Sequence, residues 1–204
     1  DLIQAIRDDL KASPVIGMDE TPVQVLHEKN RSATAKSYMW VASGFREGKK
    51  LLFFHYHPTR SGSVALEFLK GYSGYLQTDG YSGYSQVGEA PGIIHVGCMA
   101  HIRRKFFDAD KVSGGSGDAA EFLSMIASLY HTETLLRQRY ENKEPDESSF
   151  IAERKRLQEP QLAVMYEWLT ARSQSVTPSS ALGKAISYDL GNGTRWCATL
   201  IMRF

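Results

Sequence analysis

The chain has 204 residues, 42% of them hydrophobic and 23% charged, and its 24 Lys and Arg residues nearly cancel its 23 Asp and Glu residues. These values predict a globular protein with one sizeable core or two small ones, without the overall positive charge that would indicate a nucleic-acid partner. The chain has only two cysteines, without CxxC spacing, which excludes a disulfide framework and a four-ligand zinc site. This cysteine content favours a reducing, cytoplasmic location. The apolar runs are far shorter than the ~20 residues of a membrane span.

In the N-terminal half, short runs rich in Val, Phe, Tyr and Trp lie between Gly, Pro, Asn or charged turns, as is typical of β-strands. One apolar-faced segment, which Ser61 or Ser63 can cap and Gly71 can end, predicts a helix among them. The expected strands are Val15–Met18, Ser37–Gly44, Leu51–His57, Gly74–Thr78 and Ile93–Val96, and the expected helices are Ser61–Tyr72 and Met99–Ala109. This is an α/β pattern with mixed strand directions. Three strands, a helix and a strand ending in Asp is the order found in ribonuclease-H-like folds.

The pattern changes after a Gly/Ser-rich link at Ser113–Asp118. Apolar residues then recur at three- and four-residue spacing, which predicts amphipathic helices. The expected elements are helices at Ala119–Arg139 and Phe150–Arg172, a polar loop at Glu141–Ser149, and a short helix from Pro178 to Tyr188. We therefore expect a catalytic core at residues 1–112, a helical insert with a return helix at 113–190, and an atypical tail at 191–204.

Two acidic residues each follow an apolar, strand-like run. Asp19 follows Val15–Met18 and precedes Pro22, which we expect to interrupt the strand, and Asp79 follows Gly74–Thr78 and precedes a glycine turn. Hard divalent cations prefer carboxylate oxygens, and two ions ~3.5–4 Å apart can activate a nucleophile and stabilise the leaving oxygen in phosphodiester chemistry. Singly, each Asp is a common turn former. Together they favour a metal site.

Three ordered runs, and a fourth near the C-terminus, carry a family resemblance. They are IGMDETPV at 16–23, LQTDGYSGY at 76–84, GCMAHIRRKF at 97–106 and ALGKAISY at 181–188. Over residues 14 to 190 the chain resembles the insertion-sequence-66 family of DDE transposases. The resemblance implies a ribonuclease-H-like core, two Mg²⁺ or Mn²⁺ ions, cleavage of transposon ends, and joining of the 3′ hydroxyl to target DNA. It implies that Asp19 and Asp79 are the first two catalytic, metal-binding acids. It is also compatible with assembly of the chain into a homo-oligomer.

Cys98 and His101 form a CxxH pair at the start of a basic helix. Two ligands are too few for a structural zinc site, so packing is the simpler interpretation. Similar pairs accompany the second acid in several transposase families, which implies support of the active-site wall. Arg103, Arg104 and Lys105 follow and could bind DNA phosphates, although three charges on a helix are usually a solvated face.

Several other residues near the two acids allow two interpretations. Glu20 could assist metal binding, but strand alternation predicts that it points away from Asp19. Arg60 could face solvent or substrate. The tyrosines could stack on nucleotides, although aromatic residues around strands more often pack the core or its rim; they are Tyr72, Tyr75, Tyr81 and Tyr84.

The third acid of the family, a Glu in an Asn-Asn-x-x-Glu-Arg segment, has no counterpart here. Glu153, Glu159 and Glu167 lie in the helical insert and match no motif. Codons permitted for Leu190–Met202 can spell the family's continuation in a neighbouring frame, which predicts a one-nucleotide deletion near Leu190 and a frameshifted tail. The start at Asp1, without an initiator methionine, predicts a beginning internal to a longer product.

These observations support two functional hypotheses. The first is a truncated transposase catalytic domain that depends on Asp19, Asp79 and a missing Glu. The second is a non-catalytic remnant that binds DNA or an intact transposase through its helical insert. A ribonuclease-H-like nuclease unrelated to transposition is a weaker third option, because it needs another acid near Asp79. For this chain we expect the transposase lineage without activity.

Overall fold

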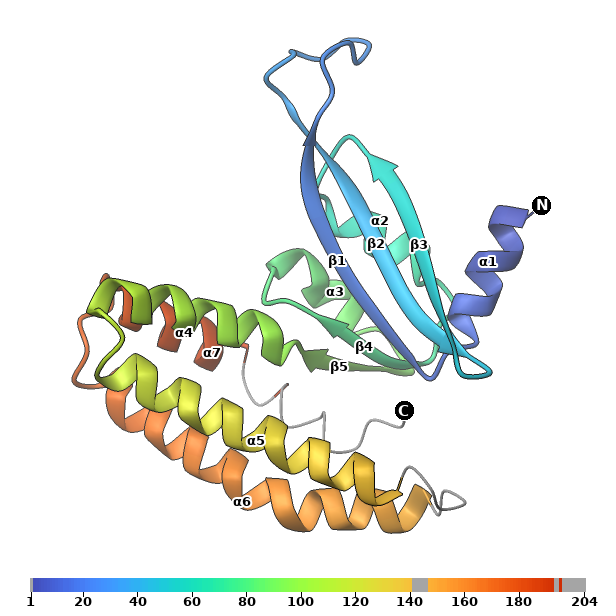
Figure 1. Ribbon diagram of the computed structural model, residues 1–204. Coiled ribbons are helices and arrows are strands. Elements are labelled where there is room, and N and C mark those ends of the chain that lie inside the picture. Colours follow the sequence, from blue (N-terminus) through green and yellow to red (C-terminus); the bar gives the residue numbers. More distant parts are fainter. Residues whose placement is uncertain (1, 141–146, 193–194, 196–204) are drawn as a thin grey trace. The chain divides into compact units, whose positions relative to one another are not determined.

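The computed structural model describes residues 2–140, 147–192 and 195. Its packing divides the chain into two compact units, one up to Val96 and one from Gly97 onward. The first unit holds a mixed sheet with helices and the second is helical (Figure 1). This confirms the predicted α/β class followed by a helical part, and it is consistent with a ribonuclease-H-like fold.

The first unit is built on a five-stranded sheet of order β3-β2-β1-β4-β5. The predicted chain order of three strands, a helix and a fourth strand is confirmed. The first three strands are antiparallel neighbours, and β1 runs parallel to β4. The strands are β1 (Val15–Gln24), β2 (Lys36–Arg46), β3 (Lys49–His57), β4 (Gly74–Thr78) and β5 (Ile93–Gly97).

The strand β1 is longer than predicted, because it does not stop at Pro22. Pro22 pairs with Tyr38 of β2, and the strand continues to Gln24. Among the described residues β4 pairs with β1 only as far as Gly17, so the outer part of β1 is an edge, where a residue without an N–H is tolerated. Asp19 therefore lies within the strand, opposite Val41, and the expectation that it ends the strand was wrong.

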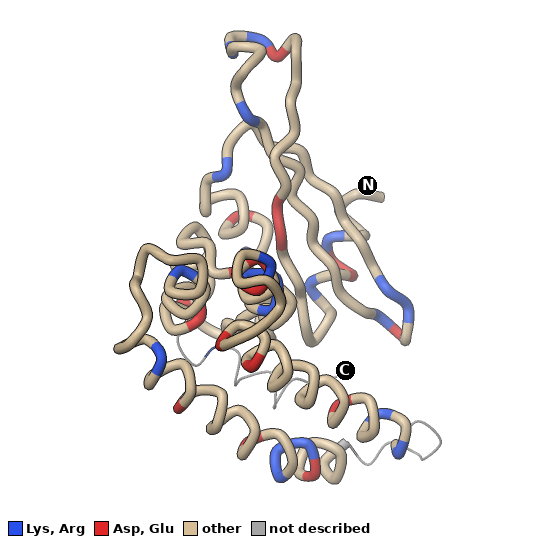
Figure 2. Tube along the Cα trace, turned by 60° about the vertical axis from the view of Figure 1, so that its left-hand side comes forward, with Lys and Arg blue, Asp and Glu red and all other residues tan. Residues whose placement is uncertain are grey.

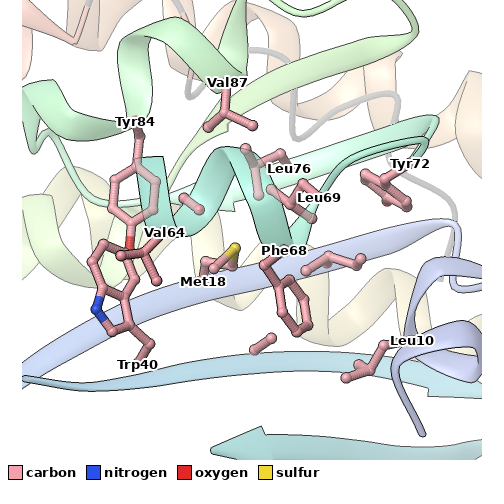
Figure 3. Packing of buried hydrophobic residues seen from close by; sticks show 13 residues of the cluster. Leu10, Met18, Trp40, Val64, Phe68, Leu69, Tyr72, Leu76, Tyr84 and Val87 are labelled. Atoms are coloured by element: carbon pink, nitrogen blue, oxygen red, sulfur yellow. The ribbon is translucent and has the colours of Figure 1, made fainter. Parts of the chain in front are cut away.

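A helix and two short turns cover one face of this sheet. The helix α2 (Gly62–Phe68) begins after Ser61, whose side chain accepts a hydrogen bond from the Ser63 backbone N–H as an N-cap. The turns η1 (Ser82–Tyr84) and α3 (Ser85–Gly88) follow β4, and neither was expected from the sequence. The core beneath them joins Met18, Trp40 and Leu76 of the strands to Phe68 and Tyr84 (Figure 3).

One further helix of the first unit, α1 (Leu2–Lys11), was not predicted. Its Leu10 is fully buried in the same core, and the helix packs against β2 and β3. Burial of this one leucine and of the half-buried Ile6 fixes a helix whose other side chains are mostly exposed.

The described residues of the second unit form four long helices. They pack around a cluster that includes Phe106 and Phe122, whose ring centroids are 4.1 Å apart, with Trp168 5.1 Å from Phe122. Gly114, with φ 76°, ends the first helix in the left-handed conformation, and Ser180 caps the last one by accepting from Gly183 N–H. The helices are α4 (Met99–Ser113), α5 (Asp118–Tyr140), α6 (Glu147–Ser173) and α7 (Ala181–Gly191).

The packing boundary lies earlier than the domain boundary expected from the sequence. The helix α4 packs against α5 and α7, so the compact units separate after Val96, not after Val112. The boundaries of the catalytic core and the insert remain predictions. Most of the tail at 191–204 lies outside the described residues, as does most of the predicted loop at 141–149. Within the described part of the chain, no helix combines the length and apolar character needed to cross a membrane.

Candidate functional site

Asp19 and Asp79 occupy equivalent positions on neighbouring parallel strands. The β1–β4 pairing runs from Val15 opposite Tyr75 to Gly17 opposite Gln77. Continuing that register by two residues places Asp19 level with Asp79, which directly follows β4. Each carboxylate is oriented by a backbone donor, because Asp19 Oδ1 accepts the Glu20 N–H at 2.9 Å and Asp79 Oδ1 accepts the Tyr81 N–H at 2.9 Å.

The Tyr84 hydroxyl is buried against the Glu20 carboxylate. Its pKa is raised, first by burial, then by its hydrogen bond with Glu20, and further by the negative charges of Glu20, Asp79 and Asp19. The Tyr84 ring stands beside the Trp40 ring, with the two ring centroids 6.0 Å apart (Figure 3). A hydrogen bond joins Tyr84 to Glu20, whereas Asp19 and Asp79 act on the Tyr84 pKa through their charges.

Glu20 points into the core side of the sheet, as strand alternation predicted. Its side chain has no exposed surface, whereas Asp19 is exposed. The Tyr84 hydroxyl donates to Glu20 Oε2, and Arg60 donates to Oε1 from Nε at 2.6 Å. Burial raises the pKa of Glu20, and the hydrogen bonds from Tyr84 and Arg60 oppose that rise. Glu20 thus serves as a buried partner of Arg60.

Asp79 is half-enclosed by the turn that follows it. Its side chain keeps 17% of its surface exposed, and its Oδ2 is 4.0 Å from Arg60 Nη2. Tyr81, whose N–H orients Asp79, also lies under Arg60, with the guanidinium carbon 3.8 Å from the ring centroid. The turn therefore fixes the carboxylate and places one cation beside it.

Cys98 and His101 contact each other at the start of α4, in the second unit. Cys98 is the N-cap residue of α4, and its carbonyl accepts the His101 N–H at 3.0 Å. Burial alone would raise the pKa of the Cys98 thiol, but hydrogen bonds from His101 and the backbone of His101 and Ala100 lower it overall. Support of the metal site by this pair stays a prediction.

The basic triplet of α4 is exposed but does not form one face. Arg103, Arg104 and Lys105 are all exposed, and consecutive helical residues point in different directions. The Arg103 guanidinium carbon lies 5.9 Å from the Phe107 ring centroid, and Lys105 Nζ lies 5.2 Å from that of Tyr188. Lys and Arg residues are also spread over the hairpin ends and other helices (Figure 2). Contact of the triplet with DNA remains untested.

Comparison with known proteins gives the lineage. The sequence profile of the transposase IS66 family matches residues 1–200. The chain belongs to the IS66 family of transposases. Two proteins of Sinorhizobium fredii described as uncharacterized, y4jD and y4qI, are 28% identical over 200 residues and 27% identical over 203 residues. No solved structure gives a significant match.

The alignments cover most of this chain but a minor part of each relative. They span 91% and 93% of the chain, against 37% and 36% of the relatives. The chain thus corresponds to a little over a third of a longer protein in each case.

The IS66 assignment implies a divalent metal ion, and the acids of the first unit fit part of its requirements. Asp19 and Asp79 offer carboxylate oxygens, the ligands that Mg²⁺ and Mn²⁺ prefer, and both are oriented by backbone N–H groups. Within residues 2–140 and 147–192, however, no group of three His, Cys, Asp or Glu side chains could hold a metal ion. The two carboxylates are thus the right type of ligand for these ions, but among the described residues there are too few of them for a complete site.

The glutamates of the helical insert belong to other interactions or to solvent. Glu153 accepts the Tyr140 hydroxyl at 2.9 Å and pairs with Arg139, and Glu159 and Glu167 are exposed on α6. All three lie in the second unit, whereas Asp19 and Asp79 lie in the first.

The sequence missed how Arg60, Glu20 and Tyr84 combine. A usable signal was present, since Glu20 follows Ile16 and Met18 at the alternate positions that face the core. A buried carboxylate needs a cationic or hydrogen-bonding partner. The expectation that tyrosines pack the core holds for Tyr72 and Tyr84, which are 3% and 0% exposed.

Proposed function

We propose that Asp19 and Asp79 are the first two metal-binding acids of an IS66 transposase, which performs metal-dependent DNA cleavage and strand transfer. The observation that carries this proposal is their register: the β1–β4 pairing, continued by two residues, places Asp19 level with Asp79, and a backbone N–H orients each carboxylate.

A bound Mg²⁺ or Mn²⁺ would supply Lewis-acid activation of a hydroxyl group and stabilisation of the leaving oxygen. The chain's own part is to hold the cation. Asp19 offers its carboxylate from the middle of a paired strand, and Asp79 from a turn fixed by the Tyr81 N–H. Ligands on such rigid supports need little reordering when the cation binds.

We further propose that these 204 residues alone bind the metal weakly and do not cleave DNA. Support comes from the incomplete donor set among the described residues. The same observation favours a second candidate function, a non-catalytic chain that binds DNA or an intact transposase. In both cases Arg103, Arg104 and Lys105 are the proposed phosphate contacts, and Cys98 and His101 the proposed support of the active-site wall.

Metal binding is tested by calorimetric titration of the whole chain with Mn²⁺. Asp19→Asn and Asp79→Asn should each weaken binding by about tenfold or more, because each removes an anionic ligand. Glu67→Gln is the matched control, since Glu67 is an exposed carboxylate on α2 and should bind like the wild type. Equal affinity in all four proteins would show that the two acids are not metal ligands.

Catalysis is tested by nicking of a labelled transposon-end duplex in Mg²⁺ or Mn²⁺. The expected result is no nicking by the 204-residue chain. Nicking that disappears in Asp79→Asn would overturn the proposed inactivity while supporting the metal site.

The DNA contacts of the basic triplet are tested by replacing Arg103, Arg104 and Lys105 with Gln. This change should lower DNA affinity and reduce the slope of log affinity against log salt by up to about three.

A further inference from the structure

Arg60 is held in a fixed orientation beside the proposed metal site. It lies between β3 and α2, and both Nε and Nη2 are 2.6 Å from Glu20 Oε1. The Glu20 side chain is fully buried, while the Arg60 side chain is 40% exposed. A buried carboxylate therefore anchors one edge of a guanidinium whose remaining surface faces outward.

The plane of the Arg60 guanidinium is fixed as well. Its carbon lies 3.8 Å from the centroid of the Tyr81 ring, and the Tyr81 hydroxyl donates to the Arg60 carbonyl. Stacking and a carboxylate anchor together restrict a side chain that is otherwise flexible. Arg60 therefore loses little further conformational entropy when it binds another group.

The remaining donors of Arg60 point to an anionic ligand. A guanidinium has five N–H donors, and the described residues provide Nη1 with no hydrogen-bond acceptor. Asp79 Oδ2 is 4.0 Å from Nη2, which is beyond hydrogen-bond distance. An arginine that only neutralised Glu20 would not need this exposed edge next to a metal-binding acid.

We propose that Arg60 binds a backbone phosphate of the DNA strand at this site. The inference rests on the proposed function, because Asp79 would hold a cation that offsets the carboxylate charge and would attract phosphate oxygens. A phosphodiester held there lies beside the free edge of Arg60, whose planar fork matches two phosphate oxygens. Glu20 and Tyr84 are positioning residues that hold Arg60 in place.

The test is DNA binding by the whole chain, measured by fluorescence anisotropy with a labelled duplex in Mg²⁺ over a series of salt concentrations. Arg60→Gln should weaken binding about tenfold and reduce the slope of log affinity against log salt by about one. Arg60→Lys should keep the slope and lose part of the affinity, because it keeps the charge without the fork.

Arg46→Gln is the matched control. Arg46 pairs with Asp9 at 2.6 Å and is 45% exposed, so it resembles Arg60 in exposure and pairing, but it lies at the far end of β2 from Trp40. It should bind DNA like the wild type. An equal loss in Arg46→Gln and Arg60→Gln would overturn the proposal, since it would reveal only a general charge effect.

Folding and metal binding are separated from phosphate binding by two further measurements. Arg60→Gln leaves the buried Glu20 unpaired, so the double variant Glu20→Gln with Arg60→Gln, which has no buried charge, must show the same loss of DNA affinity. Wild-type affinity in the double variant would overturn the inference. Mn²⁺ titration of Arg60→Gln should show no weakening of metal binding, because Arg60 is a cation beside Asp79 and not a metal ligand. A failure of Arg60 is therefore distinguishable from a failure of Asp19 and Asp79 as ligands.

Discussion

Gly62 lies against the backbone of Gly83, so closely that a Cβ at Gly62 would stand 2.1 Å from the Gly83 carbonyl oxygen. This approach joins the start of α2, directly after Arg60, to the turn that carries Tyr81 and Tyr84. The two segments that hold the proposed phosphate contact therefore meet through backbone atoms, where a side chain cannot be accommodated by a change of rotamer.

Gly62→Ala should destabilise the chain although alanine is the better helix former. Propensity favours alanine by about 1 kcal/mol, but the new methyl group meets backbone, and overpacking of this kind costs about 1–3 kcal/mol or more. We expect a net loss of about 2 kcal/mol in urea unfolding. Gly191→Ala, at the end of α7, where the described residues leave open space, should be neutral or stabilising. A stabilising Gly62→Ala would contradict the close packing.

Glu133 and Arg154 form a second buried polar pair, between α5 and α6. The Arg154 side chain is 3% exposed, and its Nε donates to Glu133 Oε2 at 2.8 Å. Glu133→Ala removes the carboxylate that pairs with the buried Arg154 guanidinium and should cost about 3–5 kcal/mol in the free energy of unfolding. Glu121→Ala, whose partner Arg172 is 41% exposed, should cost about 1 kcal/mol or less.

The double variant Glu133→Leu with Arg154→Met separates charge pairing from packing. It removes both charges and keeps apolar volume, so its unfolding free energy should lie closer to the wild type than that of Glu133→Ala. Costs that simply add in a double-mutant cycle would show that the two side chains do not act as a pair.

The sequence predicted those parts of the fold that depend on local patterns. The strand Gly74–Thr78 and the cap Ser61 match because turn residues and side-chain hydroxyls act on their immediate neighbours. The predicted end of β1 failed at Pro22, because only the pairing of β1 on one side made a proline acceptable there. Edge position is a tertiary property that local sequence does not contain.

The sequence singled out the two acids but not their surroundings. Asp19 and Asp79 follow apolar, strand-like runs, and their role as metal ligands stays a prediction. The link from Glu20 to Arg60 depends on the loop between β3 and α2 folding back onto β1. Glu20 at a core-facing position required a partner, yet the alternation pattern could not say which of the basic residues would supply it.

Asp189 should make stability depend on pH. It is 1% exposed on α7, its Oδ1 has no hydrogen-bond partner among the described residues, and burial raises its pKa from 3.8 to about 7. Because the folded pKa is raised, the stabilisation is complete below pH 3.8 and is lost as pH rises to about 7. The loss is on the order of 4 kcal/mol at full ionisation.

Asp189→Asn tests this dependence, because asparagine does not ionise. Urea unfolding at about pH 5.5 and pH 8 should show a smaller decline in the variant than in the wild type, and the variant should be the more stable protein at the higher pH. The comparison of the two proteins cancels contributions from the histidines. Parallel pH profiles would contradict a buried, unpartnered carboxyl at Asp189.

Cys98 should react faster than an ordinary thiol near neutral pH, because its hydrogen bonds with His101 and with backbone groups outweigh its burial and lower its pKa. In a Cys197→Ser background, the rate of alkylation by iodoacetamide against pH reports the Cys98 thiolate alone.

His101→Gln keeps a polar side chain of similar size but removes the imidazole, so the midpoint of the pH profile of Cys98 alkylation should move to higher pH. His131→Gln, on an exposed position of α5, is the control and should leave the midpoint in place. If His101→Gln and His131→Gln give the wild-type midpoint, then His101 does not activate the thiol, and the pair serves packing alone.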